Sequence, residues 1–193
     1  MSLTIFAPVN GGNVAAVRPF PTSPGDVNKT VLDPYIWRGL STTGGGFSTN
    51  EALWQWILAK PARVQALRNA VAERQDLRRF ALGEMWIHSP VMGGAPVELT
   101  DPTKWAVWQL HDTASRSGAA TLIRRPQATE PSFTLRLRGL AGGAGRWNVS
   151  WAFGFVVERH QVMSREELAA LRVALPQRNT SVVVRYQVLG SDS

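Results

Sequence analysis

The chain has 193 residues, of which 44% are hydrophobic and 18% are charged. This length and composition match a folded protein of one medium domain, and they exclude a disordered or fibrous chain. Cysteine is absent, which excludes disulfide frameworks, zinc ribbons, iron–sulfur clusters and thiol nucleophiles. No run approaches the ~20 apolar residues of a membrane span, and the first ten residues do not resemble a signal peptide. We expect no membrane partner, and the cytoplasm and a virion both remain open as locations.

Residues 1–49 are punctuated by glycine and proline, for example at Pro24, Gly25 and the run Gly44, Gly45 and Gly46. These residues favour turns and interrupt regular elements. The pair Asp33 and Pro34 is typical of a turn. We therefore expect an extended arm over residues 1–49 that packs on something else.

Residues 50–83 carry the clearest helical pattern of the chain. Asn50 can cap the first turn, and Pro61 either ends this helix or begins a second one at its first position. From there apolar residues recur on a broad stripe at positions 64, 67, 71 and 77. This pattern predicts a helix, ended by Gly83, that packs its apolar stripe on a core.

From residue 84 onward the apolar period changes to two, which indicates strands. Expected strands cover residues 104–111, 119–123, 132–137, 146–157 and 181–189. Ser164 and Glu167 form the sequence signature of a capping box and predict one short helix. The predicted fold class is mainly β, an antiparallel β-sandwich over residues 84–193 with an N-terminal extended arm and one or two packed α-helices.

A search for catalytic patterns finds none that is specific. There is no Walker loop, no Rossmann glycine fingerprint and no nucleophile elbow. The histidines His88, His111 and His160 lie far apart, without metal-ligand spacing. The carboxylates near turns and aromatic residues are Asp33, Glu84, Asp101 and Asp112, and they form no evident acid/base pair. We expect no catalytic residue, no metal and no cofactor.

Tryptophan is frequent, with eight residues in the chain. Indole rings fill cores and interfaces, and when exposed they stack on sugar rings. The candidate glycan-binding or interface aromatic residues are Trp86, Trp105, Trp108, Trp147 and Trp151. The candidate polyanion contacts are Arg124, Arg125, Arg136 and Arg138, of which the last two share a strand face by the period of two. Solvated charge is the ordinary alternative, so we do not expect a nucleic acid partner.

Several segments occur in an order similar to the C-terminal end of the α-galactosidase-type glycoside hydrolases of family 36, where a (β/α)8 barrel leads into an antiparallel β-sandwich. They are residues 33–39, 73–86, 105–110, Gly118 and residues 124–126, 134–140, 163–168, 171–176 and 181–186. In the family the catalytic aspartates lie in the barrel. The Lys-Trp-Asp nucleophile motif has no counterpart here, because Lys104 and Trp105 are followed by Ala106. The resemblance therefore implies no catalytic residue in this chain.

The resemblance implies a non-catalytic accessory β-sandwich domain that covers a barrel edge or a subunit interface, with carbohydrate as a further ligand. A different hypothesis is a structural subunit of a larger assembly, such as a virion capsid or tail component, whose N-terminal arm contacts neighbouring copies. Both hypotheses predict other protein subunits as partners, in a homo-oligomer or a larger assembly.

Overall fold

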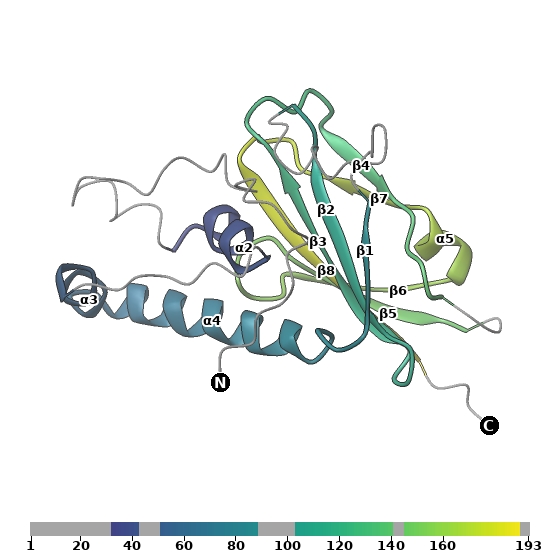
Figure 1. Ribbon diagram of the computed structural model, residues 1–193, viewed down its shortest axis with the longest axis horizontal. Coiled ribbons are helices and arrows are strands. Elements are labelled where there is room, and N and C mark those ends of the chain that lie inside the picture. The colour runs from purple at the N-terminus through teal and green to yellow at the C-terminus, as the bar shows by residue number, and fades with distance from the viewer. Residues whose placement is uncertain (1–31, 43–50, 89–102, 141–144, 190–193) are drawn as a thin grey trace.

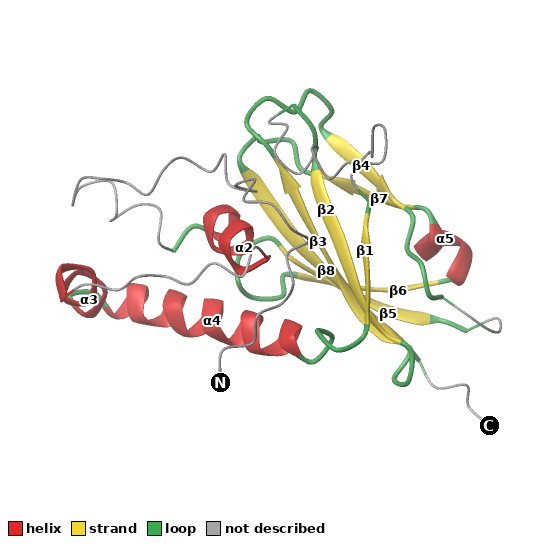
Figure 2. Cartoon of the chain, in the orientation of Figure 1, coloured by secondary structure: helices red, strands yellow, loops and turns green. Residues whose placement is uncertain are grey.

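A computed structural model describes residues 32–42, 51–88, 103–140 and 145–189. The predicted fold class is confirmed, because this part of the chain is mainly β, with a six-stranded and a two-stranded antiparallel sheet in a sandwich-like arrangement (Figure 2). The large sheet has the strand order β1-β2-β3-β8-β5-β6 and the small sheet pairs β4 with β7. The strands are β1 (Glu84–Ile87), β2 (Ala106–Asp112), β3 (Ser117–Arg124), β4 (Ser132–Leu135), β5 (Trp147–Ala152), β6 (Arg159–Met163), β7 (Leu171–Ala174) and β8 (Thr180–Val188).

Helices α2 (Pro34–Thr42) and α4 (Pro61–Arg78) lie on one side of the large sheet, and the small sheet with α5 (Arg165–Ala169) lies on the other (Figure 1). Helix α3 (Glu51–Leu58) precedes α4 and lies far from the sheet. Because layers cover both faces, the central strand β3 is buried along its whole length. For this reason the sequence of β3 lacks the alternation of apolar and polar residues that is typical of a strand with one exposed face.

The main core fills the space between the large sheet and the small one. Side chains from β2, β3, β5 and β8 meet Leu135 of β4, Leu168 of α5 and Val173 of β7 there. The capping box that the sequence predicts at α5 is confirmed: Ser164 Oγ accepts from Glu167 N at 3.2 Å, and Glu167 Oε2 accepts from Ser164 N at 2.8 Å. This cap orients the short helix that covers the end of the core.

The arm prediction is wrong over residues 34–42, which form α2 and are not extended. The physical reason is local, because Asp33 and Pro34 begin a helix here. The Asp33 carboxylate accepts a hydrogen bond from Tyr35 N at 2.8 Å, and Pro34 takes the first helical position, where its missing N–H is not needed. Tyr35 then packs on Ala106 and Trp108 of β2. The remainder of the predicted arm, residues 1–31 and 43–49, lies outside the described residues.

Helix α4 begins at Pro61 as predicted, but its apolar stripe is not what it buries. Its fully buried positions are Ala70 and Glu73, and Val71 remains 39% exposed. Leu77 and the following Phe80 do pack on Ala119 and Val183 of the sheet. Of the four positions in the predicted stripe, Leu77 at the C-terminal end of α4 is the one that joins this apolar cluster.

Candidate functional site

The structure places four of the five candidate aromatic residues in the interior. Trp105, Trp108, Trp147 and Trp151 are each at most 5% exposed. The idea that they form an exposed shelf for sugar rings is wrong, because alternate residues on both faces of the large sheet are covered by other layers. Only Trp86, on the edge strand β1, is partly accessible, and its ring lies 5.9 Å from the His111 ring.

Two of the four candidate polyanion contacts are also buried. Arg124 is 4% exposed and donates hydrogen bonds to the carbonyl oxygens of Leu175, Pro176 and Ala128 at 2.6–3.1 Å. These bonds connect the segment after β3 with the segment after β7. Arg125 is likewise only 4% exposed. The polyanion prediction is therefore wrong for these two, since a buried guanidinium group is not accessible to a polyanion. Arg136 and Arg138 are exposed beyond the end of β4.

A buried polar network links β1, β2 and β8 to the segment after β4. Gln109, fully buried, donates to the Arg138 carbonyl at 2.8 Å and to the Tyr186 hydroxyl at 2.5 Å, and its Oε1 accepts from Arg138 N at 3.0 Å. His88 Nε2 lies 2.8 Å from Gln109 Oε1, and His111 Nδ1 lies 3.1 Å from the Tyr186 hydroxyl. Burial lowers the pKa of both histidines and raises the pKa of Tyr186. This arrangement is structural, because each side chain serves another part of the same core.

The two histidines predict a loss of stability in mild acid. Because burial lowers the folded-state pKa of His111 and His88 below the ordinary 6.5, the unfolded chain binds more protons below that pH. The unfolding free energy should therefore be highest above pH 6.5 and fall as the pH decreases, by up to about 1.4 kcal/mol per pH unit for buried His111. Urea titrations at a series of pH values between 7 and 5 measure this decrease in the unfolding free energy.

The matched variants for this test are His111→Asn, which cannot titrate, and His160→Asn, which changes an exposed residue of β6. His111→Asn should flatten the pH dependence, whereas His160→Asn should leave it as it is. Equal slopes in both variants would show that His111 does not cause the effect.

Among the described residues, no three His, Asp, Glu or Cys side chains come together in a way that could hold a metal ion. Glu84 and Asp112 stand at the paired ends of β1 and β2, and Asp112 Oδ2 accepts from the Ser115 hydroxyl at 2.5 Å as part of a turn. Asp101 lies outside the described residues. The carboxylates of Asp33, Asp112 and Glu167 thus provide capping and turn contacts, and those of Glu73 and Asp76 provide ion pairs.

A buried ion cluster joins the helices to the sheet. Arg38 of α2 is 1% exposed and meets Glu73 of α4 in a bidentate pair, with N–O distances of 2.8 and 2.7 Å. The same guanidinium donates to Ser181 on β8 and to the carbonyl oxygens of residues 152, 153 and 154 after β5. One side chain therefore holds two helices, a central strand and a loop in place.

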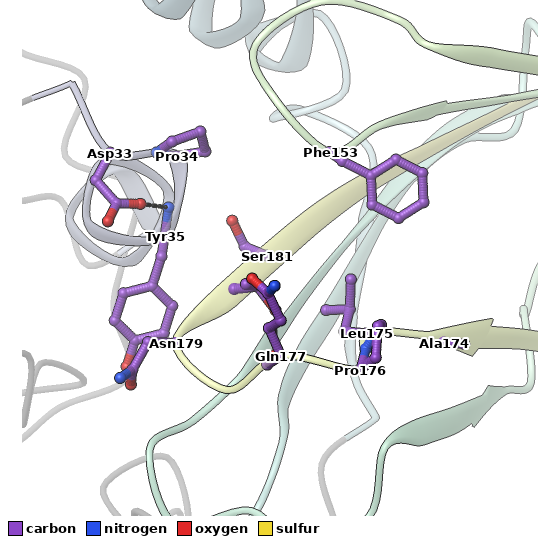
Figure 3. Close-up of a pocket in the computed structure, with 11 residues that line it drawn as sticks. Asp33, Pro34, Tyr35, Phe153, Ala174, Leu175, Pro176, Gln177, Asn179 and Ser181 are labelled. Carbon is purple, nitrogen blue, oxygen red and sulfur yellow. Dashed lines mark hydrogen bonds between the residues drawn. The ribbon is translucent and has the colours of Figure 1, made fainter.

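A small cavity opens beside this cluster, between the N-terminal end of α2 and the turn that joins β7 to β8 (Figure 3). Its volume is about 230 Å³. Phe153, Leu175 and Pro176 form apolar walls, and Asp33 and Asn179 add polar groups. Asn179 has a left-handed backbone with φ of 56°, which Asn tolerates better than most residues do. No sequence pattern indicates this cavity, because its walls come from three distant parts of the chain.

The α3–α4 surface, defined here by Trp54 and Leu58 of α3 and Arg68 and Val71 of α4, is exposed. Trp54 is 43% and Leu58 62% exposed, and their spacing of four residues places them on one face of α3. Arg68 and Val71, three residues apart, are neighbours on α4. The two acidic residues in the second half of α4 are already paired, Glu73 with Arg38 and Asp76 with Arg185. The surface is therefore apolar and basic.

In comparison with known proteins, no family model matches the chain and no curated protein matches its sequence. Among the described residues, no helix combines the length and the apolar character that crossing a membrane requires.

Proposed function

We propose that the chain is a non-catalytic packing domain, an accessory β-sandwich of the kind that the resemblance to family 36 glycoside hydrolases implies. The observation that carries the proposal is the exposed α3–α4 surface. A soluble helix normally turns its apolar side chains toward a core. Here Trp54, Leu58 and Val71 are 43%, 62% and 39% exposed, and exposed large apolar side chains are typical of interaction sites.

The charge of this surface indicates the chemistry of its partner. Arg68 and Arg78 are exposed on α4, while the acidic residues Glu73 and Asp76 are compensated by arginines from other elements. The partner surface should therefore be apolar at its centre and acidic around it. A barrel domain of the family 36 type is the occupant that this proposal commits to. The alternative hypothesis, a subunit of a larger assembly, depends on residues of the arm, and residues 1–31 and 43–49 lie outside the described part of the chain.

The test combines this chain with a family 36 barrel produced without its own C-terminal domain. Sedimentation velocity should show a monomer or small oligomer for the chain alone and a complex for the mixture, weakened by added salt. The chain alone should not hydrolyse aryl galactosides. Turnover by the chain, or the absence of any complex, would contradict the proposal.

A double variant, Trp54→Ser with Leu58→Ser, should raise the dissociation constant of the complex by tenfold or more, which corresponds to a loss of about 1.4 kcal/mol of binding free energy. The matched control is Leu82→Ser, which removes a side chain that is 93% exposed beyond the other end of α4. An equal loss of binding in both variants would mean that the α3–α4 surface is not the interface.

A further inference from the structure

The cavity beside α2 contains polar groups whose hydrogen-bonding capacity the described protein does not use. Tyr35 is only 8% exposed, and its hydroxyl has no hydrogen-bond partner among the described residues. The Asp33 carboxylate receives one hydrogen bond from the described residues, at Oδ1 from Tyr35 N at 2.8 Å. Both residues line the cavity. Asp33 is partly buried, so polar atoms in the wall of the cavity remain available to water or to a ligand.

The opposite side of the cavity has a different character. Phe153, Leu175 and Pro176 present a ring and aliphatic carbons, as the close-up shows (Figure 3). Gln177 and Asn179 stand nearby with amide groups that can both donate and accept. A ligand that fits would have an apolar face toward Phe153, Leu175 and Pro176, and several hydroxyl groups toward the polar side chains.

The electrostatic setting indicates a neutral ligand. The carboxylate of Asp33 disfavours an anion in the cavity, and Arg38 and Arg125 act electrostatically on Asp33 and Tyr35 respectively, which disfavours an organic cation. Burial raises the pKa of the Asp33 carboxyl. The group nevertheless accepts a hydrogen bond from a backbone N–H, as a helix cap does, and it remains an acceptor for hydroxyl donors.

We propose that this cavity binds a single pyranose ring, with Asp33, Tyr35 and Asn179 bonding its hydroxyls and Phe153 contacting its apolar face. The volume of about 230 Å³ lies below the ~300–1,000 Å³ of pockets for larger ligands, so one ring is the size that fits. This inference is independent of the packing function, which needs no ligand. It also moves the carbohydrate expectation from the tryptophans, which are buried, to residues that the sequence analysis did not consider for sugar binding.

The experiment titrates the full chain with methyl α-galactopyranoside, methyl β-glucopyranoside and N-acetylglucosamine, with choline as a cationic probe and inorganic phosphate as an anionic one. Amide chemical shifts report the site. We expect at least one pyranoside to saturate in the millimolar range, with shifts centred on residues 33–35 and 177–181, and no saturation by choline or phosphate.

Two variants test the contacts without removing the local fold. Asp33→Asn keeps a side chain that caps helices as well as Asp does, and Asn179→Gly keeps a residue that accepts the positive φ. Because the bond to a carboxylate is about twice as strong as a neutral one, Asp33→Asn should weaken pyranoside binding by about tenfold. The control Asn148→Ala changes an exposed residue of β5 and should have no effect.

Three results would overturn the proposal. They are the failure of all three pyranosides to saturate, unchanged binding in both Asp33→Asn and Asn179→Gly, and tighter binding of choline or phosphate than of any sugar. A failure of this kind would leave the packing function standing, because that function is read from complex formation at a different surface.

Discussion

Replacing Arg38 by Ala is expected to lower the free energy of unfolding by about 3–5 kcal/mol, the largest effect of any single substitution considered for this protein. The substitution leaves the Glu73 carboxylate, 4% exposed, without its bidentate partner. It also removes the donor for the Ser181 carbonyl and for three carbonyls after β5. Urea unfolding followed by circular dichroism measures the change.

Two further variants separate the charge from the side-chain volume. Arg38→Met combined with Glu73→Met removes both charges, so the double variant should be more stable than the sum of the two single variants predicts. Arg68 is exposed on α4, the helix that carries Glu73, and Arg68→Ala should change the free energy of unfolding by less than about 0.5 kcal/mol. An Arg38→Ala variant with an unchanged urea midpoint would contradict the structural role of the cluster.

Gly118→Ala is expected to destabilise the large sheet by about 3 kcal/mol, an overpacking cost at the upper end of the usual range. A Cβ at this position of β3 would lie 2.3 Å from the Tyr186 hydroxyl oxygen and 2.4 Å from the Leu110 carbonyl oxygen. Neither atom can withdraw easily, because Tyr186 is held by Gln109 and Leu110 belongs to the neighbouring strand. Thermal and urea unfolding both measure the loss.

The matched control for this variant is Gly145→Ala. Its Cβ would first meet a methyl group of Val188 at 3.2 Å, a contact that a small side-chain adjustment relieves. We therefore expect Gly145→Ala to lower the free energy of unfolding by less than about 1 kcal/mol. A Gly118→Ala variant as stable as the control would show that β3 can shift away from β8.

The sequence predicted those features of the fold that depend on local chemistry. The start of α4 at Pro61 and the cap of α5 at Ser164 are confirmed, since each is set by residues within one helical turn. Each of the five predicted strands overlaps an observed strand. Strands β1, β6 and β7 were not assigned as separate elements, because each is only four or five residues long and depends on its partner.

What the sequence could not predict depends on contacts between distant residues. Asp33 and Pro34 have the same appearance in a turn as at a helix start, and only the packing of Tyr35 on β2 decides for the helix. Glu73 looks like a solvated residue of an amphipathic helix until Arg38, 35 residues earlier, is brought against it. For the same reason the sequence left core packing and glycan binding both open for the tryptophans and did not predict the burial of Arg124, because burial is decided by which layer covers each face.

The position of β8 has a consequence for how the chain matures during its synthesis. This strand is the last of the described strands in chain order, yet it lies between β3 and β5 near the middle of the sheet and carries Ser181, which accepts hydrogen bonds from Arg38, 143 residues upstream. Pairings at such separations close slowly. A nascent chain whose β8 is still inside the ribosome cannot complete either the sheet or the docking of its first described helix. The native fold therefore forms only after β8 has emerged, and a truncation before β8 would leave apolar strands open to aggregation.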